Sequence, residues 1–396
     1  MATSTTPRTL ASAKALTIAS HAAFVPIGIV TVLLSPLLPT LSARWSLNYS
    51  QAGELFTAQF LASTGAVLFS GVLISRWGFR FAMKAGLFVI AVSVAGLLSG
   101  SHLLGMVCIA GYGIGIGLAV PAANLVVAEV NPARRSAALN LLNFSWSAGA
   151  VACPFLVAAA AKGHHITTFL ILVAAFTFLV AVGIALMPAS VVEPSPPKTA
   201  AAGASADLKH RSFLVMAALF FLYVGTENSF GGWVASYANS LGSMSSTISV
   251  MTPSFFYTAL MLGRWLAPLL LRRIEEVRVA QGCLLLACAG MAGMVGSRSM
   301  PGVIASASIA GLGLSAVYPI TISLLSREFG QAASRVGSWM FTCANLGGAV
   351  FPWLVGAFSN RLGTLKVGLA VPLAAGAVMF ALYRRKWESI SEPRPV

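Results

Sequence analysis

The chain has 396 residues, of which 57% are apolar and only 9% are charged. A soluble protein of this length needs far more charge to keep its surface in water, so the composition indicates a polytopic membrane protein. The formal net charge of +15 does not indicate nucleic-acid binding, because the cations lie between apolar segments, where the positive-inside rule accounts for them.

A membrane-spanning helix needs about 20 apolar residues. The polar, basic stretch 1–14 lacks a small-residue cleavage site and is typical of a cytoplasmic tail. Twelve apolar segments follow it, at 15–40, 50–74, 80–100, 103–129, 136–161, 165–187, 212–240, 250–272, 277–298, 301–326, 333–358 and 364–385.

The polar interruption Val191–Arg211 is rich in Pro, Ala, Ser and Lys, a composition typical of a solvated linker. We therefore predict an all-α membrane fold of twelve transmembrane helices in two pseudo-symmetric six-helix bundles. The predicted boundaries are 15–188 and 212–386 for the bundles, 189–211 for a cytoplasmic linker and 387–396 for a C-terminal tail.

The distribution of cations supports this topology. If both termini are cytoplasmic, the opposite face holds only five of the 25 Lys and Arg residues, namely Arg44, Lys162, Arg298, Arg361 and Lys366. A missed helix would scramble this asymmetry. We expect a protein of the bacterial inner membrane with both ends in the cytoplasm.

The two halves repeat each other at a constant offset of 198 residues. The repeated residues are Gly113, Gly115, Pro121, Ser136, Gly149 and Pro154, which correspond to Gly311, Gly313, Pro319, Ser334, Gly347 and Pro352. A repeat of this kind is the plan of secondary transporters. For any one of these residues, a role in helix packing and a role in gating both remain open.

One acidic residue, Glu227, lies within the apolar stretch Phe213–Tyr237. A charged side chain at the centre of a bilayer costs about 3 kcal/mol on insertion scales, so such residues usually mark a functional site. A carboxyl removed from water is also more readily protonated. We predict that Glu227 carries a coupling proton; a structural glutamate bonded to a neighbouring helix is the alternative.

The turn between the second and third segments carries a motif that resembles the major facilitator superfamily. Residues Gly71–Arg80 are similar to its loop signature Gly-x-Leu-x-Asp-Arg-x-Gly-Arg, with Ser75 in the acidic position and the last basic residue shifted by one, to Arg80. The resemblance implies twelve helices, transport and no enzymatic activity. It also implies gating roles for Arg76, Gly78 and Arg80.

Within that superfamily, Tyr223–Trp233 and Gly263-Arg264 resemble the fucose-permease-like sugar transporters. The sugar–proton members of that group carry carboxylates in helices one and four, whereas here Glu129 stands at the cytoplasmic end of helix four. Arg264 would pair with Glu227 only if the two lie at the same depth; we favour a gate or helix-end position for it.

Polar residues at mid-membrane positions are the candidate substrate ligands. Amides and hydroxyls pair with the hydroxyls of a polyol, and aromatic faces cover the apolar face of a sugar ring. Each of the amides has the alternative role of joining helices, and Trp233 and Tyr237 that of interface aromatics. The candidates are Asn228, Trp233, Tyr223, Tyr237, Gln59, Asn124, Asn143, Tyr318 and Asn345.

These residues favour a monomeric secondary transporter that moves a sugar or similar neutral polar solute, by proton symport and alternating access. Proton-coupled efflux of lipophilic or amphipathic compounds is the alternative, and a membrane sensor without transport is a third. The partners we expect are the small-molecule substrate, protons and the lipid bilayer, with no nucleic acid. The five cysteines lie in apolar runs without metal-ligand spacing, and we predict no cofactor and no metal.

Overall fold

The computed structural model describes residues 7–97, 101–188, 211–242, 246–329 and 333–391, and these are helical with short connections. The first half contains α1 (Pro7–Val32), α2 (Leu34–Trp45), α3 (Tyr49–Gly96), α4 (His102–Val130), the 3-10 turn η1 (Pro132–Arg134), α5 (Arg135–Lys162) and α6 (Ile166–Ala185). The second half contains α7 (Arg211–Ser240), α8 (Ser246–Leu270), α9 (Glu276–Gly296), α10 (Met300–Leu314), α11 (Val317–Phe329), α12 (Ala333–Leu362), α13 (Leu365–Gly368) and α14 (Ala370–Ser391).

Ten helical stretches among the described residues are long and apolar enough to cross a membrane. One of them, Tyr49–Gly96, contains two spans, because Gly78 interrupts it with φ 84° and ψ 171°. A positive φ of this size is strained for any residue with a Cβ atom, so the glycine specifies the turn. With this division and the 25-residue α8, each of the twelve predicted spans corresponds to one helix or to two consecutive helices. The predicted all-α membrane fold is confirmed.

Two spans that we predicted as continuous helices are broken in the middle. The span 15–40 breaks at Leu33, between α1 and α2, and the span 301–326 breaks between α10 and α11. Pro36 and Pro319 explain both breaks. A proline cannot donate to the carbonyl four residues earlier, and its ring crowds that carbonyl. By contrast, α7 continues without a break through the adjacent glycines Gly231 and Gly232.

The ends of the chain also differ from the prediction. α1 begins at Pro7, inside the predicted tail 1–14, and α14 continues to Ser391, inside the predicted tail 387–396. Proline is favoured in the first turn of a helix, because the N–H it lacks has no helical partner there. The predicted linker 189–211 lies outside the described residues, except for Arg211, which begins α7.

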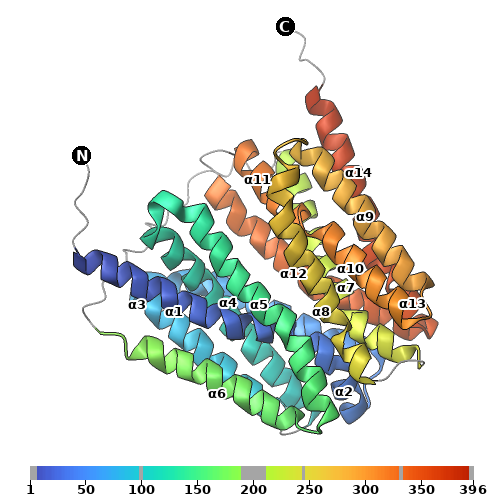
Figure 1. Ribbon diagram of the computed structural model, residues 1–396, viewed down its shortest axis with the longest axis horizontal. Helices are drawn as coiled ribbons and strands as arrows, with labels where there is room; N and C mark the ends of the chain where they lie inside the picture. Colours follow the sequence, from blue (N-terminus) through green and yellow to red (C-terminus); the bar gives the residue numbers. More distant parts are fainter. Residues whose placement is uncertain (1–6, 98–100, 189–210, 243–245, 330–332, 392–396) are drawn as a thin grey trace. The chain divides into compact units, whose positions relative to one another are not determined.

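The described residues divide into two compact units. Residues 7–33 and 58–188 form the first unit, and residues 34–57 and 211–391 form the second. In the first unit, α1 packs along α5 and α4. In the second, α7 packs along α12, and α10 lies side by side with α9 and α8 (Figure 1).

Residues 34–57 pack within the second unit, although we placed them in the first bundle by their order in the chain. The Ser35 hydroxyl donates to the Gly231 carbonyl at 2.6 Å, and the Thr57 hydroxyl donates to the Ala349 carbonyl at 2.9 Å. The Phe56 ring packs against Trp233, with ring centroids 6.2 Å apart. The apolar pattern shows that a helix has a buried face, but it does not say which helix covers that face.

The repeated glycines occupy equivalent helix crossings in the two units. A Cβ atom on Gly149 would collide with the Val25 carbonyl of α1, and one on Gly347 would collide with the Phe221 carbonyl of α7. Gly113 approaches the Gln59 carbonyl as Gly311 approaches the Phe256 carbonyl (both in neighbouring helices). Close approach of backbones is what small residues provide in membrane helices. The structure therefore gives these glycines a packing role.

Candidate functional site

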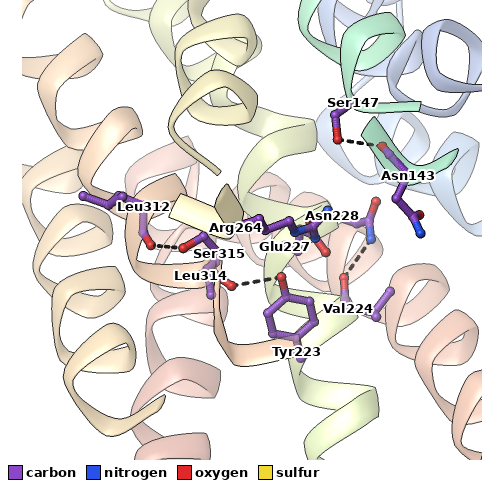
Figure 2. Close-up of polar contacts among 10 residues, drawn as sticks. All are labelled: Asn143, Ser147, Tyr223, Val224, Glu227, Asn228, Arg264, Leu312, Leu314 and Ser315. Carbon is purple, nitrogen blue, oxygen red and sulfur yellow. Dashed lines mark hydrogen bonds and ion pairs between the residues drawn. The ribbon is translucent and has the colours of Figure 1, made fainter. Parts of the chain in front are cut away.

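An ion pair inside the second unit is the centre of the candidate site. Glu227 lies near the middle of α7, and Arg264 reaches it from α8, with Nη2 3.4 Å from Oε1 (Figure 2). The Glu227 side chain is 13% exposed and that of Arg264 is 27% exposed, so both keep some accessible surface. Arg264 therefore lies opposite Glu227, inside α8 and not at the helix end considered from the sequence. A gating role for Arg264 stays a prediction. The two side chains pair because they lie at the same depth in the membrane, and that depth is set by the packing of α7 against α8.

Two tyrosines and a phenylalanine form a packed aromatic layer beside this pair. Tyr223 and Tyr318 stack with ring centroids 5.2 Å apart and an interplanar angle of 28°, and Phe220 meets Tyr318 edge-on at 5.6 Å. Both tyrosines lie close enough to Glu227 and Arg264 to interact with them electrostatically. Tyr223 is buried, and its hydroxyl donates to the Leu314 carbonyl at 3.1 Å (Figure 2).

The break between α10 and α11 leaves a carbonyl that needs a hydrogen-bond donor, and Tyr223 provides one. Leu314 is the last residue of α10, so its carbonyl faces a helix end, and a carbonyl without a partner is costly in a membrane protein. The Tyr223 hydroxyl supplies that partner. We missed this contact because we predicted a continuous helix; Pro319, close to the break, is the signal that would have revealed it.

Two glycines bring the helices of the site together. A Cβ atom on Gly263 would collide with the Ser315 hydroxyl, so this glycine lets α8 approach the end of α10. A Cβ atom on Gly225 would lie 2.5 Å from the Phe351 ring of α12. Gly263 immediately precedes Arg264, so the close approach of α8 fixes the position from which the arginine side chain extends.

Two predicted amides remain partly exposed in the same unit. The Asn228 Nδ2 donates to the Val224 carbonyl of its own helix at 2.9 Å (Figure 2). Asn345 on α12 is half-buried, and its side-chain amide makes no hydrogen bond within the described part of the chain. Both amides retain hydrogen-bonding capacity for a ligand.

Trp233 and Tyr237, which we predicted as substrate ligands, are packed between helices. The Trp233 ring is 1% exposed, and its Nε1 donates to the Pro352 carbonyl at 2.9 Å. Tyr237 is also 1% exposed, and its hydroxyl bonds the Val295 and Ser297 carbonyls at 3.4 and 3.3 Å. In this conformation both side chains join helices of the second unit, because each polar atom finds its partner on a backbone carbonyl.

In the first unit, Gln59 belongs to a closed polar network. Its Nε2 donates to the Thr31 carbonyl at 3.1 Å, and its Oε1 accepts from the Tyr112 hydroxyl at 3.2 Å. Gln59 is 3% exposed, and Trp146 donates to the Thr31 hydroxyl at 3.4 Å. The network joins α1, α3, α4 and α5, so here the amide serves helix packing, the alternative considered for each such residue.

The other two predicted amides of the first unit are more open. Asn124 on α4 is half-buried and Asn143 on α5 is exposed. Each Nδ2 donates to the carbonyl four residues earlier in its own helix, at 2.9 Å. Their amide oxygens stay available, and their role as substrate ligands stays a prediction.

The motif in the turn inside α3 has a clear structural role. Gly78 supplies the positive φ, and Arg76 is exposed. The Arg80 Nη2 donates to the Ile184 carbonyl at 3.2 Å and to the Met187 carbonyl at 2.5 Å. These carbonyls lie at the C-terminal end of α6, where a cation and a donor are both favourable. Arg80 therefore joins the start of the third span to the end of the sixth.

We expect Arg80→Ala to destabilise the protein by about 1.5–3 kcal/mol, because hydrogen bonds to a charged donor have that worth and two carbonyls lose their partner. Arg76→Ala, on the exposed side of the same turn, is expected to leave stability within about 0.5 kcal/mol of the wild type. Thermal unfolding in detergent compares the two variants. A stable Arg80→Ala protein that has lost transport would instead assign Arg80 to the gating role predicted from the motif.

The arrangement in the second unit suits reversible binding of a polar solute. It combines one carboxylate, one guanidinium and two partly exposed amides beside the aromatic layer. The charges of the carboxylate and the guanidinium cancel. A neighbouring arginine stabilises the charged form of a carboxylate. Protonation of the carboxylate removes the charge that attracts the guanidinium. Sites of this composition bind small polar molecules by hydrogen bonds and aromatic contact.

Comparison with known proteins places the chain in a family. The family model of the Major Facilitator Superfamily matches residues 21–352. The chain is 26% identical over 362 residues to the glucose/galactose transporter of Brucella abortus biovar 1 (strain 9-941), and the match covers 85% of each protein.

Solved structures share the fold. That of the nucleoside transporter NupG has a TM-score of 0.76 at 13% identity, covering 94% of this chain and 99% of that one. That of the Escherichia coli fucose:proton symporter FucP has a TM-score of 0.65 at 19% identity, covering 93% and 98%. With the helical architecture, the internal repeat and the turn motif, the match over most of its length shows that this chain belongs to the major facilitator superfamily of membrane transporters and is not an enzyme.

Proposed function

We propose that this protein takes up a sugar or similar neutral polar solute by proton symport across the bacterial inner membrane, with alternating access between two six-helix halves and both termini in the cytoplasm. The observation that carries the proposal is the Glu227–Arg264 pair among partly exposed polar side chains. While Glu227 is charged, the pair has no net charge, so a neutral substrate adds no uncompensated charge at this depth. The similarity to a glucose/galactose transporter supports a hexose.

A proton fits this site better than a sodium ion. Sodium binding to Glu227 would bring a second cation next to Arg264, whose guanidinium lies 3.4 Å from the carboxylate oxygen. Like charges at such separations repel strongly where water is scarce. A proton instead neutralises the carboxylate and adds no separate charge beside the arginine.

Uptake into proteoliposomes tests the proposal. We expect accumulation of labelled D-glucose, D-galactose or L-fucose when the outside is acidic, loss of that accumulation with a protonophore, and no accumulation driven by a sodium gradient alone. A labelled nucleoside and a lipophilic cation serve as comparison substrates. Flux of the lipophilic compound without sugar uptake would establish the efflux alternative, and binding without flux would indicate a sensor.

A further inference from the structure

Arg264 is incompletely paired in the structure. A well-made arginine–carboxylate pair has two parallel hydrogen bonds of about 2.7–2.9 Å. Here the Arg264 guanidinium reaches Glu227 through a single contact of 3.4 Å, and its buried Nε has no hydrogen-bond partner among the described residues. An arginine has five N–H donors, so most of the donor capacity of Arg264 is unused by Glu227.

The backbone of Arg264, in contrast, is held firmly. Gly263 allows α8 to pack closely against Ser315. The Ser315 hydroxyl donates to the Leu312 carbonyl at 2.6 Å, at the end of α10 (Figure 2). A residue with any side chain at 263 would push the helix away. The helix is thus positioned closely, whereas the Arg264 side chain, 27% exposed, reaches Glu227 through one long contact of 3.4 Å.

We propose that Arg264 is a substrate ligand that changes partner during the cycle, an inference that rests on the proposed function. While Glu227 is charged, Arg264 pairs with it. When Glu227 takes up a proton, the attraction between the two side chains falls, and Arg264 donates two N–H groups to adjacent hydroxyls of the sugar. The planar fork of a guanidinium matches two neighbouring oxygen acceptors. The proton and the neutral sugar travel together, so each cycle moves one positive charge.

The surroundings of the pair direct this exchange toward the substrate. Among the described residues, the titratable groups that interact with the Glu227 carboxylate are Arg264 of α8, Tyr223 of α7 and Tyr318 of α11. The two tyrosines stack on each other. The Tyr223 hydroxyl donates to the Leu314 carbonyl and also interacts with both members of the pair, which fixes that side of the site. Arg264 is the group left with both charge and unused donors.

A double-mutant cycle tests the inference by equilibrium binding of the transported hexose to purified protein at pH 5.5 and pH 8. The variants are Glu227→Gln, Arg264→Met and the double variant, which removes both charges together and so leaves no buried ion unpaired. We expect the wild type to bind more tightly at pH 5.5, and Glu227→Gln to bind tightly at both pH values. The double variant is expected to bind about tenfold or more weakly than Glu227→Gln, because the hydrogen bonds to a charged donor are lost.

The controls keep folding separate from binding. Arg278 pairs with Glu275 at 3.7 Å, and both side chains are mostly exposed, so the change Glu275→Gln with Arg278→Met should leave sugar affinity unchanged. Melting temperatures verify that each variant is folded. If the double variant binds as tightly as Glu227→Gln, Arg264 is only a counter-ion and the inference is overturned. If neither the wild type nor Glu227→Gln binds any of the hexoses, the proposed substrate class is wrong, and this inference fails with it.

Discussion

Replacing Glu227 by glutamine is expected to abolish proton-driven accumulation of the substrate while exchange of substrate across the membrane continues. Glutamine keeps the size and hydrogen-bonding ability of a protonated carboxyl group but cannot release a proton. The variant would therefore remain in the substrate-binding form, with Arg264 released from its pair. Movement of loaded protein in both directions needs no proton release, so exchange persists.

The size of the effect follows from the coupling ratio. One pH unit is worth about 1.4 kcal/mol per proton, so a one-proton symporter sustains about a tenfold substrate gradient for each unit. Proteoliposomes with an imposed pH gradient should show this accumulation for the wild type and an inside-to-outside ratio near one for Glu227→Gln. Counterflow, measured with unlabelled substrate inside, should remain comparable for both proteins.

Glu54→Gln provides a matched control, because it makes the same chemical change at a half-buried position of α3, and Glu54 is not among the groups that interact with Glu227 or Arg264. It should accumulate substrate as the wild type does. If Glu227→Gln accumulates substrate normally, Glu227 has no part in coupling, and its pairing with Arg264 serves only to hold α7 and α8 together.

A single methyl group at Gly347 is expected to destabilise the protein strongly. The Cβ atom of Gly347→Ala would collide with the Phe221 carbonyl and carbon of α7, which are backbone atoms and cannot rotate away. α7 and α12 would have to separate along the crossing that also carries Gly225 and Phe351. Overpacking of this kind costs about 1–3 kcal/mol, and the site on α7 would be displaced with it.

Gly282→Ala on α9 is the matched control and should have the opposite sign. Nothing lies within 4 Å of the position that its Cβ would occupy. Alanine is favoured over glycine inside a helix by about 0.5–1 kcal/mol, so this variant should be unchanged or slightly more stable. Thermal unfolding and the yield of monodisperse protein in detergent report the difference. Equal stability of the two variants would contradict the close approach of α7 and α12.

The internal repeat extends this prediction to the first unit. Gly149 stands 198 residues before Gly347 and meets the Val25 carbonyl of α1 in the same manner. Gly149→Ala should therefore cost a similar amount. The offset was visible in the sequence, but it could not distinguish packing from gating. The distinction needed the position of the neighbouring carbonyl.

The candidate site was predictable in part. Glu227 stood out because a carboxylate in an apolar segment is costly wherever it points. Its partner was not predictable, since Arg264 lies 37 residues away on another helix, and their meeting depends on the depth and rotation of both helices. The same limit applies to Trp233 and Gln59. Their chemistry suited a ligand, but in the structure their polar atoms bond backbone carbonyls and, for Gln59, a tyrosine.

The sequence by itself determined the features that depend on local chemistry. Segment length and apolarity defined twelve spans, the cation distribution defined an expected orientation, and the spacing of glycines and prolines defined a repeat. Each depends on hydration and on hydrogen bonds within one helix, and these are properties of neighbouring residues. The turn at Gly78 belongs to the same class.

Only the tertiary structure decided which side chains meet. It placed residues 34–57 in the second unit, broke two spans near Pro36 and Pro319, and set Arg264 opposite Glu227. Helix faces in a membrane protein are apolar on nearly every side, so hydropathy does not select among neighbours. Selection comes from close backbone approach at glycines and from the need of each buried polar atom for a partner, and both depend on residues distant in the chain.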